Sequence, residues 1–212
     1  MRSSLLVLAL SLVACTRSQP VVTAPPLPTV RVDVWHDTIC PWCRIGLHTL
    51  DTVVAETKDV RVDVVHHAFL LDRLDAMFER VSAAGAPYGV RFAWDKVRVS
   101  PDTTASHVLL AWAPVEQRAG LLEAIHRAHF EDGKNLGDVD VLAGLARARG
   151  LDADAARAAL NDPARRAAAR AEAAAATTRG ITGVPHFVIG GQSLNGAQSP
   201  QALAAAIRAS TK

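Results

Sequence analysis

Two cysteines, Cys40 and Cys43, are spaced as a dithiol that can form and break a disulfide bond. Two residues separate them, which on a helix is about one turn and brings both sulfurs within reach of each other. A zinc site would instead need four ligands, and no second cysteine pair or ordered Cys/His group occurs in the chain. We therefore predict a redox site in which both cysteines react without a metal or cofactor. The alternatives are half a zinc site and a purely structural disulfide.

The residues around the pair predict a strand that ends before it and a helix that begins at it. Residues 30–35 alternate apolar with polar side chains and are rich in β-branched residues, as strands are. Apolar residues recur at helical spacing over about 41–56. Pro41 suits the first turn of this helix, because the N–H that proline lacks would have no partner there.

This arrangement places Cys40 at the N-terminus of the helix. Free N–H groups and the helix dipole favour a negative charge at that end. Cysteines in such Cys-X-X-Cys sites have pKa values of roughly 3.5–7 instead of about 8.5. We therefore expect Cys40 to react as a thiolate, with Cys43 closing the disulfide.

The remainder of the chain predicts a mixed α/β domain. Residues 60–69 are a second alternating segment, so that strand, helix and strand make a parallel βαβ unit. Helical periodicity dominates from about 72 to 180. Strand-forming residues return at 187–194 around a two-glycine hairpin turn, and a last helix follows them.

The histidines give no second site in the sequence. His66 and His67 are adjacent in a strand and so face opposite sides of the sheet, where they cannot chelate one ion. His126 and His129 share a predicted helix but have no carboxylate pattern nearby. We interpret all four as packing or surface residues.

The overall charge gives no indication of nucleic-acid binding. The 212 residues include 23 Lys and Arg against 21 Asp and Glu, and the basic residues are scattered over Ala-rich helices. Half of the residues are hydrophobic, which is enough for one sizeable core.

The amino-terminal residues predict export and a lipid anchor. Residues 1–14 join one arginine to a short apolar run of secretory-signal length. The run ends in a Leu-Val-Ala-Cys sequence at Cys15, which resembles the lipobox of bacterial lipoproteins and implies lipidation of Cys15. Thr16 rather than Asp after it implies, by the same resemblance, the outer membrane. An ordinary signal peptide with an incidental cysteine is the alternative.

Residues 15–29 predict an extended tether. Their four prolines cannot donate backbone hydrogen bonds and favour polyproline-type extension. We expect the folded domain, residues 30–212, to be held at the cell envelope by lipidated Cys15 and to face the periplasm. Disulfide exchange on exported proteins is useful in such an oxidising compartment.

Four groups of residues, in the same order along the chain, give it a resemblance to the DsbA-type thiol–disulfide oxidoreductases and, within them, to the FrnE-like branch. They are residues 37–46, 100–103 with 107–110, 130–138, and 183–189 with 193–198. The similarity covers about 30–210. It implies a thioredoxin-like fold with a helical insertion at about 72–180.

The resemblance also implies the parts of the site. Pro185 is expected to be cis and adjacent to the two sulfurs, with the backbone of Val184 pairing with an extended substrate segment. Pro41 and Trp42 are expected to tune the redox potential, and in this chain they replace the Pro-His of the strongly oxidising DsbA proteins.

The reaction implied by the resemblance is disulfide exchange through a mixed disulfide at Cys40. The expected partners are cysteine-containing exported proteins and a redox partner that recycles the pair. The oxidising and reducing directions both stay open, because the potential decides between them. Asp33 is a candidate proton relay to Cys43, and the alternative for Asp33 is an exposed strand carboxylate.

Two other classes of function compete with disulfide exchange. The same fold resembles the hydroxychromene-carboxylate isomerases and kappa-class glutathione transferases, which bind glutathione. Those enzymes commonly have Ser at the first sulfur position, whereas this chain has Cys40. The second alternative is a tethered module that binds a metal or protein without catalysis.

Overall fold

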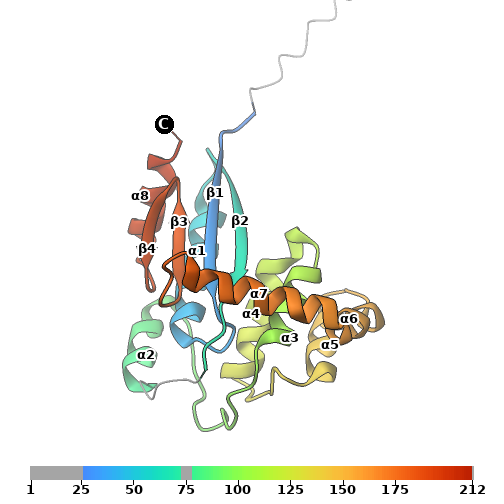
Figure 1. The fold of residues 1–212 in the computed structure, drawn as a ribbon. Helices are drawn as coiled ribbons and strands as arrows, with labels where there is room; N and C mark the ends of the chain where they lie inside the picture. The colour runs from blue at the N-terminus through green and yellow to red at the C-terminus, as the bar shows by residue number, and fades with distance from the viewer. Residues whose placement is uncertain (1–25, 73–77, 212) are drawn as a thin grey trace, which may run out of the picture.

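The structure is a computed structural model that describes residues 26–72 and 78–211. These residues form a four-stranded sheet with helices against both of its faces (Figure 1). The mixed α/β fold predicted from the sequence is confirmed. The predicted signal peptide, Cys15 and most of the predicted tether lie outside the described residues.

Helices connect and flank the strands along the described residues. In chain order they are α1 (Pro41–Glu56), α2 (Phe78–Gly85), the 3-10 helix η1 (Ala86–Tyr88), α3 (Thr104–Trp112), α4 (Val115–Phe130), α5 (Val139–Ala148), α6 (Ala153–Asn161), α7 (Pro163–Thr178) and α8 (Pro200–Ala209).

The strands of the sheet have the order β2-β1-β3-β4. β1 (Thr29–His36) lies parallel to β2 (Arg61–Ala68) and antiparallel to β3 (His186–Ile189). β4 (Gln192–Asn195) pairs antiparallel with β3 at the edge. Since α1 connects β1 to β2, the predicted parallel βαβ unit is confirmed.

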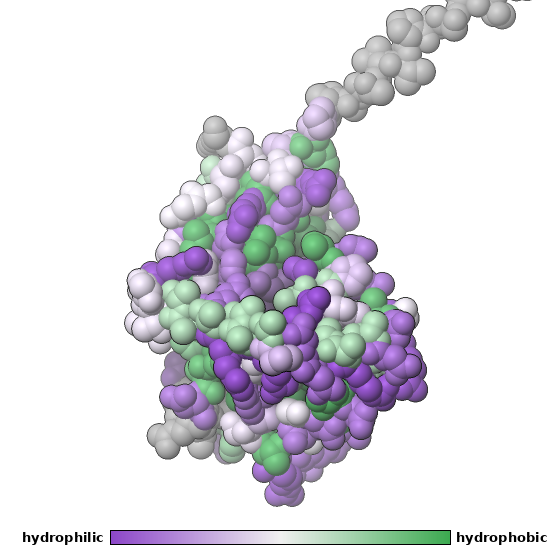
Figure 2. Space-filling model, turned by 45° about the vertical axis from the view of Figure 1, so that its right-hand side comes forward, coloured by the Kyte–Doolittle hydropathy of each residue, from purple (hydrophilic) through white to green (hydrophobic). Residues whose placement is uncertain are grey.

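Alternation along β1 gives the sheet two different faces. Val32 and Val34 point to one face and are fully buried in a core that α1, α3 and α8 complete. Asp33 and Trp35 point to the other face, where Trp35 packs against Ala176 of α7. Figure 2 shows α7 as a pale green band of alanines bordered by purple side chains. One face of the sheet therefore carries the main apolar core, and the other carries polar groups beneath α7.

The predicted helical insertion is confirmed, since α2 to α7 all lie between β2 and β3 in the chain. Asp138, Asp152 and Asp162 start α5, α6 and α7, and each side chain accepts hydrogen bonds from backbone N–H groups of the first turn. These caps satisfy donors that a helix start otherwise leaves without a partner. α7 then brings the chain back across the sheet (Figure 1).

The predicted hairpin between β3 and β4 is also confirmed. Gly190 and Gly191 have φ angles of 55° and 82°. A two-residue hairpin turn of type I′ needs positive φ at both positions, which glycine adopts without strain.

Within residues 26–72 and 78–211, no helix combines the length and the apolar character that crossing a bilayer requires.

Candidate active site

Cys40 is the N-cap residue of α1, directly after the turn that ends β1. Its sulfur accepts a hydrogen bond from the backbone N–H of Cys43 at 3.3 Å. Pro41 occupies the first turn of the helix. The predicted position of Cys40 is therefore confirmed, and it is a position where backbone donors and the helix dipole favour a negative charge.

Cys43 lies one turn further along α1 and is completely buried, whereas Cys40 is 4 % exposed. Both are free thiols in this structure. Burial raises the pKa of the Cys43 thiol well above its usual range, and the neighbouring Cys40 and the charge of Asp37 raise it further. The Cys43 thiol therefore stays protonated at neutral pH. It must lose a proton before it can attack a disulfide.

The loop before β3 brings Val184 and Pro185 to Cys40. The thiol of Cys40 donates a hydrogen bond to the carbonyl oxygen of Val184 at 3.7 Å. The peptide bond between Val184 and Pro185 is cis. The cis form of Pro185 and the contact of its loop with Cys40 are confirmed, while the pairing of Val184 with a substrate segment stays a prediction.

Gly46 allows α1 to approach this loop closely. A Cβ atom at Gly46 would lie 3.0 Å from Cγ of Pro185 and 3.3 Å from Cζ of Phe187. Any larger residue would therefore push the proline away from the helix that carries the cysteines.

Asp37 is a buried carboxyl in the turn before Cys40, and it was not among the site residues predicted from the sequence. Its side chain accepts hydrogen bonds from the backbone N–H of Ile39 at 3.2 Å and of Leu71 at 2.6 Å. Its backbone carbonyl accepts one from the N–H of Cys40 at 3.1 Å. Burial raises the pKa of Asp37, and the charge of His107 opposes the rise. The sequence feature that could have identified it is an acidic residue directly after a buried strand.

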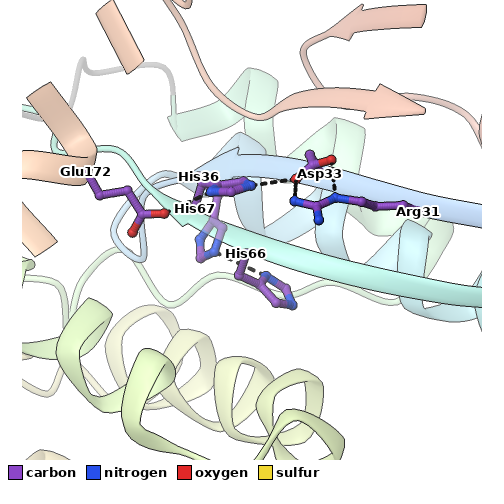
Figure 3. A network of polar contacts seen from close by, with 6 residues as sticks. All are labelled: Arg31, Asp33, His36, His66, His67 and Glu172. Carbon is purple, nitrogen blue, oxygen red and sulfur yellow. Dashed lines mark hydrogen bonds and ion pairs between the residues drawn. The ribbon is translucent and has the colours of Figure 1, made fainter. Parts of the chain in front are cut away.

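Asp33, the predicted relay or strand carboxylate, lies on the α7 side of the sheet. It forms an ion pair with Arg31 at 2.6 Å and a contact with His67 at 2.7 Å (Figure 3). Cys43 belongs to the core on the opposite face. The structure therefore brings Asp37, and not Asp33, to the cysteines.

His67 also contacts Glu172 of α7, at 2.8 Å, and stacks on Trp35 with the ring centroids 4.4 Å apart. Burial opposes protonation of His67, but its hydrogen bonds to Glu172 and Asp33 outweigh burial and raise its pKa. His66 instead contacts His36 on the other face. The prediction that the two adjacent histidines face opposite sides is confirmed.

Trp42 forms part of the rim of the site and is half-buried. It packs against a small cluster centred on Ile45, Val81 and Val90, which joins α1 to α2. The guanidinium of Arg80 lies over its ring, 5.8 Å from the centroid. The rim next to the cysteines is thus aromatic and carries a positive charge.

Among the described residues, no group of three or more His, Cys, Asp or Glu side chains is placed to hold an ion. The site combines a dithiol at a helix N-terminus, a cis proline and a buried carboxyl. Such an arrangement is suited to thiol–disulfide exchange, because one sulfur is positioned to attack and the other to resolve.

Comparison with known proteins assigns this arrangement to a family. Residues 31–208 match the DsbA-like thioredoxin domain, which is most of the chain. The chain belongs to the DsbA-like thioredoxin domain family. The thioredoxin-like fold with a helical insertion is therefore confirmed.

Individual members with the DsbA-like fold differ in their described activities. The chain is similar to a probable DsbA oxidoreductase from Streptomyces coelicolor, at 29 % identity and a TM-score of 0.71, over 85 % of this chain and 89 % of that one. It is 26 % identical to the uncharacterized protein YwbO of Bacillus subtilis, over 80 % of this chain and 91 % of YwbO. A 2-hydroxychromene-2-carboxylate isomerase shares the fold at 15 % identity and a TM-score of 0.70, over 84 % and 95 % of the two chains.

Proposed function

We propose that this DsbA-like protein is a protein thiol–disulfide oxidoreductase that exchanges disulfides with cysteine-containing exported proteins. The observation that carries the proposal is the pair of reduced cysteines at the start of α1, with Cys40 in contact with both the Cys43 N–H and the Val184 carbonyl. Its similarity to a probable DsbA oxidoreductase supports the same reaction.

The chemistry begins at Cys40. In the reducing direction its thiolate attacks a substrate disulfide and forms a mixed disulfide, and one substrate thiolate leaves. Cys43 then loses its proton and attacks Cys40, so that the second substrate thiolate leaves and the Cys40–Cys43 disulfide forms. The oxidising direction reverses these steps. The potential of the pair decides the direction, and 30 mV corresponds to about 1.4 kcal/mol for two electrons.

The cis-proline loop supports a way of holding the substrate. Gly183 and Val184 precede Pro185, and Gly183 is exposed to solvent. An extended substrate segment that pairs with the backbone of Val184 would present its sulfur to Cys40. Backbone pairing of this kind is independent of side chains and suits an enzyme with many protein substrates.

A glutathione-dependent isomerase is the second candidate, because this chain shares its fold with a 2-hydroxychromene-2-carboxylate isomerase. The presence of a sulfur at both positions favours disulfide exchange over isomerisation. Isomerisation would not require Cys43, whereas exchange through an intramolecular disulfide does.

We further propose that the protein works at the cell envelope, as a member of the FrnE-like branch held by a lipid on Cys15. The support is the signal-like sequence of residues 1–14 and the proline-rich residues that follow it. Metabolic labelling with a fatty acid tests this proposal, since a Cys15→Ser variant is expected to lose the label.

The decisive experiment measures reduction of insulin disulfides and oxidative refolding of a reduced substrate by the wild type, Cys40→Ser and Cys43→Ser. We expect Cys40→Ser to be inactive in both reactions. Cys43→Ser is expected to accumulate mixed disulfides with substrate, because nothing resolves them. Activity retained by Cys40→Ser would contradict the proposal, and glutathione-dependent isomerisation retained by Cys43→Ser would favour the second candidate.

A further inference from the structure

The redox site has a proton that must move through the interior of the protein. Cys43 and Asp37 both have no solvent exposure. Each time Cys43 passes between thiol and disulfide, one proton must leave its sulfur or return to it. Because the sulfur itself has no contact with water, the proton needs polar groups that lead from the site to the surface.

A cavity of about 220 Å³ lies next to the turn that carries Asp37. Its walls include His36 at the end of β1, His66 on β2 and His107 on α3. Arg118 of α4 and Glu172 of α7 complete its polar lining, and the Glu172 side chain is 42 % exposed. The cavity therefore connects solvent between α4 and α7 with the buried end of β1.

The three imidazoles of this cavity are neighbours in space. Nδ1 of His66 lies 3.2 Å from Nε2 of His36 (Figure 3), and the rings of His36 and His107 are 5.2 Å apart at their centroids. Among the described residues, the buried Nδ1 of His36 and Nε2 of His107 have no hydrogen-bond partner. Each imidazole can accept a proton on one nitrogen and release one from the other.

Asp37 connects these histidines to the cysteines. It follows His36 in the chain and shares the turn of Cys40. The hydroxyls of Thr38 and Ser106 are 2.7 Å apart, which ties this turn to α3 one residue before His107. Burial raises the pKa of Asp37 and lowers that of His107, and the charge of each opposes the shift of the other. The Thr38–Ser106 contact therefore holds the start of α3, which carries His107, against the turn of Asp37.

The charged and titratable groups facing this set come from several elements. They are Cys43 on α1, His67 on β2, Arg118 and His126 on α4, and Glu172 on α7.

We propose that the cavity lined by His36, His66 and His107 is the route by which the proton of Cys43 reaches solvent, with Asp37 as its first acceptor. The S–H bond of Cys43 breaks, the carboxylate takes the proton, and the imidazoles pass it to water in the cavity. The Cys43 sulfur keeps the electron pair and attacks Cys40, whose bond to the substrate sulfur breaks. When the exchange runs in the opposite direction, the same groups return the proton.

This inference rests on the proposed function, and one experiment separates the two. The reduced full chain is mixed with dithiobis(nitrobenzoic acid), which releases one coloured thiolate when Cys40 attacks and a second when Cys43 resolves the mixed disulfide. In the wild type we expect two releases, of which only the second depends on the proton route. If the wild type releases only one, the proposed function itself fails.

His107→Ala is the main variant. We expect its first release to stay within about twofold of the wild type and its second to slow by about tenfold or more. General acid–base groups contribute about 10²–10⁴-fold, and the other imidazoles of the cavity remain in this variant. Added imidazole can enter the enlarged cavity and is expected to restore at least part of the lost rate. If His107→Ala does not fold, His66→Gln provides the same comparison, because its side chain is only partly buried.

His67→Gln is the matched control, because His67 is the neighbour of His66 but faces the other side of the sheet. Asp33→Asn is a second control on that side. Both are expected to keep the rate of the second release within about twofold of the wild type, because neither removes an imidazole of the cavity. The proposal is overturned if the histidine variants that fold resolve at the wild-type rate, or if their slower second release has the wild-type pH profile and no response to imidazole.

Discussion

The guanidinium of Arg44 donates a hydrogen bond to the carboxylate of Glu131, which ties the residue after Cys43 to the end of α4. A second donor of Arg44 reaches the carbonyl oxygen of Arg91 at 2.6 Å. The Arg44 side chain is 2 % exposed, and its guanidinium lies 5.2 Å from the ring centroid of Phe92. The helix that carries the cysteines is therefore joined to the insertion by an ion pair whose arginine is buried.

Arg44→Met is expected to lower the free energy of unfolding by about 1–3 kcal/mol, because it removes the hydrogen bonds to Glu131 and to the carbonyl oxygen of Arg91. Urea unfolding followed by circular dichroism measures this change. Arg157→Met is the matched control, since Arg157 pairs with Asp140 and Asp154 at the surface. A loss below about 1 kcal/mol is expected there. Equal losses in both variants would contradict a structural role for the Arg44–Glu131 pair.

Gly46→Ala is expected to reduce both stability and the rate of disulfide exchange. The added methyl group meets Pro185 at 3.0 Å and Phe187 at 3.3 Å, so the cis-proline loop must move away from Cys40. Overpacking of this kind costs about 1–3 kcal/mol, which exceeds the gain of up to about 1 kcal/mol from replacing a helical glycine.

Gly144→Ala in α5 is the control for helix propensity, because a Cβ atom there meets nothing within 4 Å. It is expected to stabilise the protein by up to about 1 kcal/mol. Thermal unfolding and the insulin-reduction rate of the two variants make the comparison. A Gly46→Ala variant that behaves like Gly144→Ala would mean that the close approach to Pro185 has no consequence.

His67 is expected to make the stability depend on pH. Its pKa is raised in the folded protein because its bonds to Glu172 and Asp33 outweigh burial. The stabilisation is therefore complete below the unfolded pKa of about 6.5 and is lost as the pH rises through the folded pKa. The wild type should exceed His67→Gln in unfolding free energy at pH 5.5 by on the order of 1 kcal/mol and by less at pH 8.5. A difference that grows with pH would have the wrong sign.

Alkylation is expected to distinguish the two thiols. Cys43 is completely buried and its pKa is raised, so little thiolate is available there at neutral pH. Brief treatment of the reduced protein with iodoacetamide at pH 7 should modify Cys40 at least about tenfold more than Cys43. Peptide mapping by mass spectrometry gives the ratio, with the denatured protein as the reference in which both react alike. Preferential labelling of Cys43 would reverse the assigned roles.

Much of the fold could be predicted because local patterns and tertiary contacts agree. The β-branched alternation of β1, the start of α1 at Pro41 and the paired glycines of the hairpin each have one favourable local structure. The aspartates at helix starts behave in the same way, because a cap acts within its own turn. The cis form of Pro185 came from family resemblance and not from a local pattern.

The site was predictable only in part, because its members meet through packing. The spacing of Cys40 and Cys43 is a local feature of the sequence, and it predicts the redox pair without any tertiary contact. Asp33 and Asp37 are both acidic residues near the end of one strand, and only the direction of each side chain separates them. That direction places Asp33 with Arg31 and His67, and Asp37 beside the cysteines.

The sequence by itself therefore determined the redox pair, its position at a helix start and the order of strands and helices along the chain. These depend on residues a few positions apart, whose spacing and propensities act locally. The tertiary structure alone decided which distant groups face the sulfurs. Val184 reaches Cys40, Arg44 meets Glu131, and the histidines of β1, β2 and α3 line one cavity, because sheet register and helix packing bring together residues far apart in the chain.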